Sequence, residues 1–472
     1  MTVDLLIARA SEQYRLGQKG KALSAIRAGI AIEPAFGQLH LMRGVILKEF
    51  SSPSAVSGLL RATALVSEDS HPHVQLGICH ETAGHPRRAA GSFRRAAALS
   101  PANSETWLSL ARLAYDRARL DDTIAYRQRA IATDARAETG ALLGVALAAS
   151  GRWHEALPLF ERDLYRRHGA EAAIEPLTTF AKLCQDAEQF ENLIGIGRLP
   201  PSMVETAAIY RQIQEVLPRE GNPAVILEGA ARQHVASTYN RILHRDPGSA
   251  VSGSALNPRL DVEEITRTYF STKPQVVVVD DLLTPEALSC VLRFCQESTI
   301  WYIGTYSAGY IGTQMADGFA APILFQIAEE LKSRLSAIIG DAGLHHLWAF
   351  KYDSRFSGIA LHADSALINV NFWVTPDDAN LDPASGGLEV FDAAAPPDWD
   401  FATYNANPDK ARHYLEQVGS RSLVIPHRQN RAVIFHSDLF HRTGDIHFRE
   451  GYLNRRINIT MLYGVRPKAV TS

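Results

Sequence analysis

Three pairs of residues in the chain have the spacing His-x-Asp, in which one residue separates a histidine from an aspartate. They are His244 and Asp246, His362 and Asp364, and His436 and Asp438. On a β-strand, side chains i and i+2 point to the same face, so each pair can offer an imidazole and a carboxylate to one metal ion. The spacing arises easily by chance, so the surrounding sequence must decide among the pairs.

The pair His362 and Asp364 has the most suitable surroundings. It opens the run "ALHADSALINVNFWVT", which is rich in residues that favour strands, and His441 follows 77 residues after Asp364. That separation is long enough for the chain to cross a sheet and return, so His441 can supply a third ligand. Two histidines and one carboxylate on one side of a metal ion, with its other positions open, are typical of non-haem iron oxygenases.

The other two pairs fit a metal site less well. Asp246 runs directly into Pro247, where strand alternation fails. After His436 only His441 and His447 follow, and the chain between them is too short to reach a facing strand. We therefore expect His436 to be structural or to support the ligands from behind, and His447 to face solvent.

An arginine lies on the strand predicted after the last of these histidines. In "NRRINITMLYG" the residues Arg456, Asn458 and Thr460 alternate with an apolar face. Arg455 has the opposite parity, and we expect it to leave the strand end for solvent. A buried guanidinium needs an anionic partner, and its fork matches a carboxylate. We therefore expect Arg456 to pair with the carboxylate of a ligand.

A β domain must position these residues. After residue 270 come several short segments, rich in Val, Ile, Phe and Thr and bounded by turn residues: "HLWAFKYD", "ALINVNFWVT", "GGLEVFD", "SLVIPH", "RAVIFH" and "RRINITMLYG". This pattern predicts a cupin-like jelly roll, or double-stranded β-helix. Before them, "QVVVVDDLLTPEALSCVLRFC" predicts a strand, a turn and a helix that Thr284 and Pro285 open.

The first 170 residues repeat with a period near 34. Small residues recur at Gly44, Gly77, Ala111 and Gly144, and stretches such as "ETWLSLARLAYDRA" predict amphipathic helices. Each repeat is therefore expected to be a helix pair, and the region resembles a tetratricopeptide-repeat (TPR) solenoid. Such a solenoid forms a concave groove, which predicts a docking surface for a protein or peptide; a scaffold or dimerisation arm is the alternative.

The whole chain is accordingly predicted to be a multidomain α + β protein. The predicted parts are a repeat domain (1–170), a helical extension that ends in the linker "DPGSAVSGSALNPRL" (171–270), and the β domain (271–472). A net charge of −3 gives no reason to expect a nucleic-acid partner, and no apolar run suits a membrane span or a secretory leader. We expect a cytoplasmic protein without a membrane partner.

The site residues together resemble a known family. His362-x-Asp364, then "GGLEVF", then "FHSDLFH" ending in His441, then "RRIN" with Arg456 resemble the iron(II)- and 2-oxoglutarate-dependent dioxygenases, among them the prolyl hydroxylases. The resemblance covers roughly residues 275–465. It implies that the two histidines and the aspartate bind Fe(II), that 2-oxoglutarate and O₂ are co-substrates, and that Arg456 pairs with the distal carboxylate of 2-oxoglutarate.

The same resemblance implies two further co-substrate contacts. Tyr352 stands ten residues before His362, as in the family, and would hydrogen-bond the same carboxylate. Asn458 stands where the family often has serine or threonine. Asn369 and Asn371 share the polarity of the site face, and they either touch 2-oxoglutarate or satisfy each other.

Aromatic residues near the predicted site have two readings each. Trp399 and Tyr404 lie in a long insertion, residues 392–429, which is a candidate lid, and they either contact substrate or fold back onto the barrel. Three tyrosines before the barrel could line its entrance: Tyr302, Tyr306 and Tyr310.

Three functional hypotheses follow from these observations. The leading one is a hydroxylase that oxidises a side chain of a protein or peptide docked by the repeats. The second is a small-molecule 2-oxoglutarate oxygenase whose repeats serve assembly. The third is a catalytically inactive, repeat-based binding module.

Overall fold

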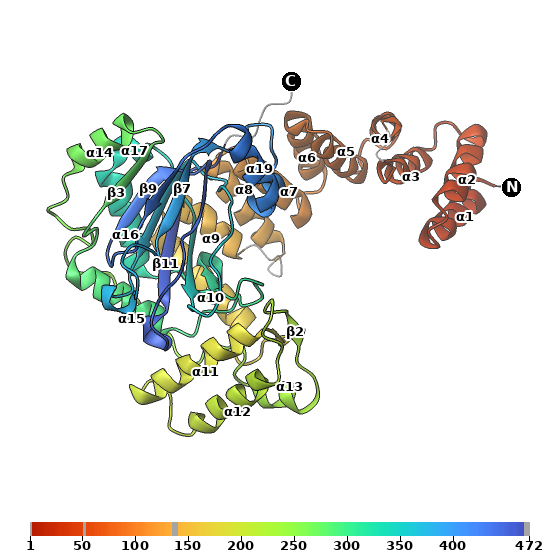
Figure 1. Ribbon diagram of the computed structural model, residues 1–472. Helices are drawn as coiled ribbons and strands as arrows, with labels where there is room; N and C mark the ends of the chain where they lie inside the picture. The colour runs from red at the N-terminus through yellow and green to blue at the C-terminus, as the bar shows by residue number, and fades with distance from the viewer. Residues whose placement is uncertain (1, 51–52, 135–139, 467–472) are drawn as a thin grey trace. The chain divides into compact units, whose positions relative to one another are not determined.

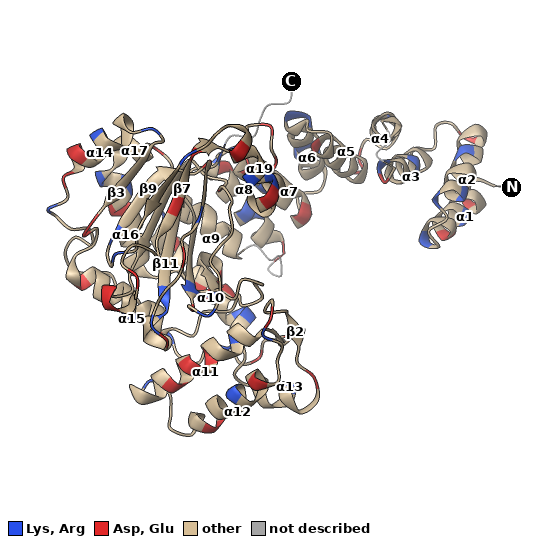
Figure 2. Cartoon of the chain, in the orientation of Figure 1, with Lys and Arg blue, Asp and Glu red and all other residues tan. Residues whose placement is uncertain are grey.

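The computed structural model describes residues 2–50, 53–134 and 140–466. The chain divides into two compact units, residues 1–139 and residues 140–470, and each is described by itself. None of the described helices is both long and apolar enough to cross a membrane. Basic and acidic residues are interspersed along both units, in keeping with the small net charge (Figure 2).

Within its described residues the first unit consists of four helix pairs (Figure 1). They are α1 (Val3–Arg15) and α2 (Lys19–Ile32), α3 (Gly37–Lys48) and α4 (Ser54–Leu65), α5 (His71–Thr82) and α6 (Pro86–Leu99), and α7 (Ser104–Tyr115) and α8 (Leu120–Thr133). The first helices of successive pairs begin at residues 3, 37, 71 and 104, so the pairs repeat every 33 or 34 residues. The unit is a TPR-like helical region.

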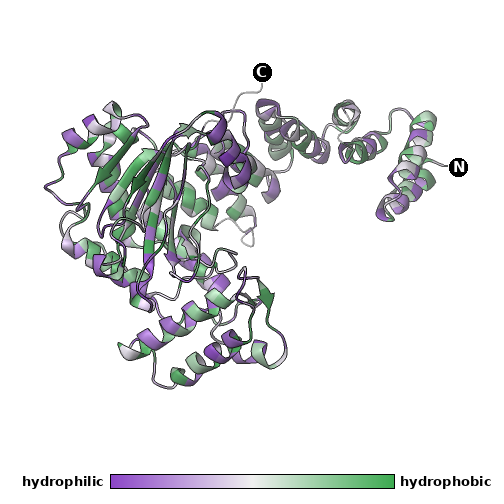
Figure 3. Cartoon of the chain, viewed as in Figure 1, coloured by the Kyte–Doolittle hydropathy of each residue, from purple (hydrophilic) through white to green (hydrophobic). Residues whose placement is uncertain are grey.

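Small residues let the two helices of a pair touch. A Cβ added at Gly44 would lie 2.5 Å from Cγ of Leu59, and one at Gly77 would lie 2.5 Å from the ring of Phe93. A larger side chain at either position would push the helices apart, because protein interiors are close-packed. Figure 3 shows hydrophobic and hydrophilic residues together on the repeat helices, as amphipathic helices require.

The next helix pair belongs to the second unit. It consists of α9 (Gly140–Ala149) and α10 (Trp153–His168), and it packs against the β domain, where the ring of Trp153 stacks on that of Phe325 at 6.1 Å between centroids. The sequence pattern predicts that the repeats extend to residue 170, whereas the boundary between the two compact units lies before this helix pair.

Residues 171–245 form a helical cluster with a hydrophobic core of its own. Its elements are α11 (Phe180–Gly195), α12 (Met203–Glu215), α13 (Gly229–Val235) and a small two-stranded sheet of β1 (Leu177–Thr178) and β2 (Val225–Ile226). The cluster lies at the bottom of the view in Figure 1.

Residues 246–260, predicted as a linker, contain no helix and only an isolated β-bridge at Leu256. The segment is nevertheless packed: Asp246 forms an ion pair with Arg293 at 2.9 Å, and Glu330 accepts a hydrogen bond from the backbone N–H of Leu256 at 2.9 Å. It is therefore part of the second unit's surface and not a free tether.

The β domain contains two antiparallel sheets. The larger has the order β3 (Val276–Val279), β9 (Ala432–His436), β6 (Ile368–Trp373), β11 (Arg456–Tyr463), β5 (Leu344–Tyr352) and β4 (Ile311–Gln314). The smaller has the order β10 (Leu439–Thr443), β7 (Leu388–Ala394) and β8 (Ser422–Ile425). Each predicted strand segment contains an observed strand, and the sheets do not close into a barrel.

The inner faces of the two sheets share one hydrophobic core. It joins Val276, Trp373, Val433 and Phe435 of the larger sheet to Leu388, Val390, Ile425 and Leu439 of the smaller. Four helices accompany the larger sheet: α14 (Val262–Ser271), α15 (Pro285–Glu297), α16 (Pro322–Arg334) and α17 (Ser336–Ile339). As predicted, Thr284 caps α15, because its side chain accepts a hydrogen bond from the N–H of Ala287.

The insertion at residues 392–429 folds against the smaller sheet. It contains α18 (Phe401–Ala406) and α19 (Pro408–Gln417), which share a hydrophobic cluster with Phe440 of β10. The ring of Trp399 lies 6.2 Å from that of Phe440, so this predicted lid residue folds back onto the domain. Tyr404 is buried in the same cluster.

Candidate metal centre

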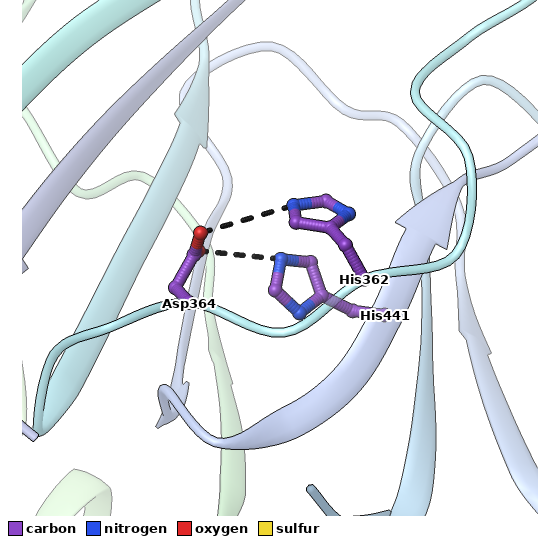
Figure 4. Close-up of side chains that lie close together, drawn as sticks. All are labelled: His362, Asp364 and His441. Carbon is purple, nitrogen blue, oxygen red and sulfur yellow. Dashed lines mark ion pairs between the residues drawn. The ribbon is translucent and has the colours of Figure 1, made fainter. Parts of the chain in front are cut away.

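The three predicted ligands lie together in the structure. His362, Asp364 and His441 point toward one another in Figure 4, and their ligand atoms all lie within 4.8 Å of one another. Oδ1 of Asp364 is 3.8 Å from Nε2 of His362, and Oδ2 is 3.4 Å from Nε2 of His441. Asp364 and His441 are buried, and His362 is partly exposed. Two imidazole nitrogens and one carboxylate thus face a common point.

Backbone pairing fixes the distance between the two histidines. His441 lies in β10, whereas His362 and Asp364 lie in the connection between β5 and β6, outside the strand predicted for them. An isolated β-bridge joins His362 to His441, with backbone N–H···O distances of 3.0 and 2.8 Å. The two histidines therefore occupy facing positions although only one lies in a regular strand.

Each imidazole is oriented by a hydrogen bond on its far side. Nδ1 of His362 lies 2.9 Å from the carbonyl oxygen of Ala360, and Nδ1 of His441 lies 2.9 Å from that of Leu439. A carbonyl oxygen only accepts, so Nδ1 carries the proton in both rings and Nε2 is the atom left to bind a metal. Metal-binding histidines are commonly held in this way.

A chain of amides supports the carboxylate. Nδ2 of Asn369 donates to Oδ2 of Asp364 at 2.7 Å, and Asn371 donates in turn to Asn369. Asn458 and Thr460 both donate to Oδ1 of Asn371 at 2.8 Å. The two site-face asparagines therefore satisfy each other, and Asn458, expected to contact a co-substrate, is bonded to Asn371 while its own Oδ1 has no partner among the described residues.

The protonation states suit metal binding. Burial and the neighbouring His441 lower the pKa of His362 to about 4. Burial acts to raise the pKa of Asp364, but the neighbouring histidines outweigh it and hold that pKa below its usual range. At neutral pH the cluster therefore offers a neutral imidazole and a carboxylate, the forms that bind metals.

Arg456 lies on the inner face of β11, as the strand parity predicts, and it is 1% exposed. Its guanidinium stacks on the ring of Tyr352 at 4.7 Å and donates to the carbonyl oxygens of Gly386 and Gly387. Its Nη1 has no hydrogen-bond partner, and it forms no ion pair with any described carboxylate. Burial lowers the pKa of Arg456 to about 10. A buried positive charge without an anion is costly, so the site favours an anionic ligand.

The neighbouring arginine contradicts its prediction. Arg455 was expected to reach solvent, but it is 3% exposed and forms ion pairs with Glu188 of α11 at 2.7 Å and with Asp353 at 3.0 Å. Parity placed it correctly on the face opposite Arg456. The error came from expecting an arginine on an apolar face to turn out to solvent at the strand end, because α11 supplies a carboxylate there from 267 residues away in the sequence.

The remaining predicted histidines lie outside the metal cluster. His436 hydrogen-bonds to Asp438 at 2.6 Å, and His447 is exposed, both as expected. His244 is 3.9 Å from Glu297, and its neighbour Asp246 pairs with an arginine.

The entrance tyrosines separate into two groups. Tyr302 is buried and stacks on His168 at 3.6 Å, away from the cluster. Tyr306 and Tyr310 stack on each other at 4.3 Å, and the ring of Tyr310 lies 5.6 Å from that of Tyr352. Only the second group adjoins the site.

A groove of about 1040 Å³ runs beside the segment that carries His362. Its walls are residues 356–361, the outer face of β7, α19 of the insertion, and residues 442–447. Residue 361 immediately precedes His362, but His362, Asp364 and His441 do not line this groove. A second cluster with metal-binding side chains, Cys184, Glu188 and Asp353, lies elsewhere and includes both carboxylates that pair with Arg455.

Comparisons with known proteins concern the helical repeats. No family model and no curated protein matches the sequence. Among solved structures, the MamA protein is similar over 37% of this chain and 98% of its own, at 17% identity and a TM-score of 0.34. YrrB, a TPR protein with an unusual peptide-binding site, covers 33% of this chain and 82% of its own (17% identity, TM-score 0.30). A thermophilic TPR protein of Thermus thermophilus, TTC0263, covers 34% and 89% (16% identity, TM-score 0.28).

Sequence reasoning missed two buried residues near Arg456. Trp373 ends β6 and shares the parity of Asn369 and Asn371, so the alternation in "INVNFW" could have placed it on the site face. His427 lies in the connection between β8 and β9, within "VIPHRQN", where no motif or period marks it.

Proposed function

We propose that the second unit is an iron(II)- and 2-oxoglutarate-dependent dioxygenase. One observation carries the proposal: two neighbouring sites each lack a charge partner among the described residues. The His-Asp-His cluster has a carboxylate but no Lys or Arg paired with it, and the buried Arg456 has no carboxylate paired with it. Both lie between the same two sheets, joined by the asparagine chain from Asp364 to Asn458.

The donor set fits the metal that the family uses. Two imidazole nitrogens and one carboxylate oxygen are the facial set of non-haem iron(II) oxygenases, and a borderline-soft divalent ion accepts this combination well. The carbonyl oxygens behind His362 and His441 and the amide behind Asp364 would hold the three ligands in place. Fe(II) would therefore be held by His362, Asp364 and His441.

The pocket around Arg456 fits the carboxylate of 2-oxoglutarate. The free Nη1 of Arg456 offers a donor, and the ring of Tyr352 supports the guanidinium from its face. A carboxylate there would remove the cost of the buried charge and gain a charge-assisted hydrogen bond. Asn458, with its unpartnered Oδ1, lies two residues further along the same strand face.

The order of the strands supports a double-stranded β-helix. In that architecture eight strands are divided between two sheets, and here β5, β6, β9 and β11 lie in the larger sheet, with β7, β8 and β10 in the smaller. The bridge from His362 to His441 adds a short eighth member beside β10. Such a fold would hold the metal and the carboxylate pocket between its sheets.

The residues of the chain would divide the work as follows. Bound Fe(II), with 2-oxoglutarate and O₂, supplies an oxidation that converts a substrate C–H to C–OH while 2-oxoglutarate becomes succinate and CO₂. His362, His441 and Asp364 would hold the ion, Arg456 would orient the co-substrate, and the packed inner faces would exclude water.

For the substrate we propose a protein or peptide bound by the repeat unit. A stack of helix pairs forms an extended concave surface, which suits a polypeptide better than a small molecule. If the repeats serve assembly alone, the second unit would act on a small molecule with unchanged efficiency after the repeats are removed. If the chain is an inactive binding module, it would form no succinate under any condition.

The test is succinate formation. The full chain, supplied with Fe(II), O₂ and 2-oxoglutarate, should produce succinate at a rate that chelation abolishes and that a cell peptide extract increases. The His362→Ala/Asp364→Ala variant should be inactive while the repeat unit keeps its thermal transition. Activity in that double variant, or none in the wild type with every extract, would exclude the proposal.

A further inference from the structure

Four unpartnered polar atoms lie close to Arg456 in the interior of the second unit. They are Nη1 of Arg456, Nε1 of Trp373, and both ring nitrogens of His427. The three side chains come from β11, the end of β6 and the connection after β8, and they are 1%, 0% and 5% exposed. Buried polar atoms are nearly always hydrogen-bonded, so a group of this kind marks a place where a ligand supplies the partners.

The three side chains surround one region. The guanidinium carbon of Arg456 is 5.6 Å from the ring centre of Trp373, and that ring is 5.9 Å from the ring of His427. Gly386 closes the third side: its carbonyl accepts from Arg456, and a Cβ added to it would lie 3.3 Å from Cβ of His427. The ring of Phe448 meets His427 edge-on at 5.0 Å.

No described protein group accounts for the three side chains. The carboxylate nearest to His427 is that of Asp377, at 3.8 Å, which is beyond hydrogen-bonding distance, and its side chain is 59% exposed. Each unsatisfied buried group costs roughly 1–3 kcal/mol, so three together would be a large burden for packing alone.

The donor inventory identifies the ligand chemistry. The indole N–H of Trp373 only donates, a neutral imidazole donates once and accepts once, and the guanidinium donates. The three side chains therefore offer three donors and a single positive charge, and a carboxylate, with one negative charge and several lone pairs, complements both. Burial and the charge of Arg456 keep His427 neutral, since they lower its pKa to about 3.

We propose that His427 and Trp373, with Arg456, form a three-donor pocket for the distal carboxylate of the co-substrate. The proposal rests on the proposed function and deepens it, because it assigns the recognition of that carboxylate to two residues outside the motif. Trp373 and His427 would contact the carboxylate directly, whereas His362, Asp364 and His441 would hold the metal ion.

The test is the binding of 2-oxoglutarate to the full chain loaded with Mn(II), measured by calorimetry without turnover. Trp373→Phe and His427→Phe keep a ring and remove the donors, so each should weaken 2-oxoglutarate binding by ~10-fold, the effect of one lost hydrogen bond to a charged group. Mn(II) affinity should not change. Trp399→Phe, on the outer face of the smaller sheet, is the matched control and should bind as the wild type does.

A second ligand, which lacks the distal carboxylate, shows whether the effect of each variant depends on that carboxylate or on the rest of 2-oxoglutarate. 2-Oxopentanoate has a methyl group where 2-oxoglutarate has its distal carboxylate, so its weaker binding should be the same in the wild type and in both variants. If one variant fails to fold, the other decides. Wild-type affinity for 2-oxoglutarate in a folded variant would overturn the three-donor pocket and leave the proposed function standing. A wild type that binds no 2-oxoglutarate would overturn both.

Discussion

Two groups of side chains in the second unit have the composition of a metal site, but only one of them has carboxylates that are already paired with arginines. In the first, His362, Asp364 and His441 face one another, and no described Lys or Arg forms an ion pair with them. In the second, Cys184, Glu188 and Asp353 lie equally close together. The second group, however, is already neutralised by guanidinium groups.

Two arginines provide that neutralisation. Arg455 is buried between Glu188 and Asp353, and Arg355 pairs with the same two carboxylates. The cluster therefore holds α11 to the ends of β5 and β11 and leaves no charge for a cation to balance. Proximity of ligand atoms is thus a weak sign of a metal site, and the absence of an internal cation is the more informative one.

The same contrast separates the two adjacent arginines. Arg455 forms ion pairs with carboxylates. Arg456 instead donates to carbonyl oxygens and stacks on an aromatic ring, and its Nη1 has no hydrogen-bond partner. One position stabilises the fold, and the other is suited to a ligand.

Replacing Arg455 should damage stability most. Arg455→Met removes the buried cation between Glu188 and Asp353 and leaves the more exposed Arg355 beside them, so the free energy of unfolding should fall by about 3–5 kcal/mol. Urea unfolding of the metal-free chain, followed for the second unit, measures this loss. A change below about 1 kcal/mol would mean that the cluster does not depend on Arg455.

Replacing Arg456 should damage ligand binding instead. Arg456→Met removes an uncompensated charge, so the free energy of unfolding of the ligand-free chain should change by less than about 1 kcal/mol. The Kd for 2-oxoglutarate should rise by ~100-fold, because the charge-assisted contact is lost. Equal effects of the two arginine variants on both quantities would remove the distinction between them.

The sequence predicted much of this arrangement. The period of alternation placed Arg456 and Arg455 on opposite faces of β11, and the spacing singled out His362, Asp364 and His441. Both signals are local, since they depend on strand geometry and on the order of ligands along the chain.

What could not be predicted depends on contacts between distant segments. Glu188 pairs with Arg455 from 267 residues away, and no pattern in α11 marks that carboxylate as an inward one. His427 lies in an irregular connection, where side-chain direction has no period to reveal it. The bridge that pairs His362 with His441 was likewise invisible, because residues 362–364 form no regular strand.

Acid should destabilise the second unit through His427. Its pKa in the folded chain is lowered to about 3 by burial, whereas an unfolded histidine has a pKa near 6.5. Between these values the unfolded chain binds a proton that the folded chain does not, so stability is kept above about pH 6.5 and lost as the pH falls toward 3. Between neutral pH and pH 4.5, the free energy of unfolding should fall by about 2–3 kcal/mol less in the His427→Phe variant than in the wild type. Parallel pH profiles of urea unfolding would contradict this assignment.

The smallest effect is expected at Cys184. Cys184→Ser keeps a small polar group beside Arg355, whose Nη2 lies 2.9 Å from the sulfur. The free energy of unfolding should therefore change by about 1 kcal/mol. The number of Mn(II) ions bound per chain should stay the same, because the cluster is neutralised by arginine. Loss of a bound ion in this variant would show that the second cluster is a metal site after all.

The most direct measurement is a calorimetric titration of the full chain with Mn(II), a divalent ion that the same ligand set accepts. Three proteins are compared: the wild type, His441→Ala and Glu188→Gln. We expect one Mn(II) per chain in the wild type and in Glu188→Gln, and a loss of Mn(II) affinity of at least ~100-fold in His441→Ala. Binding that survives in His441→Ala but disappears in Glu188→Gln, or no binding in the wild type, would contradict this expectation.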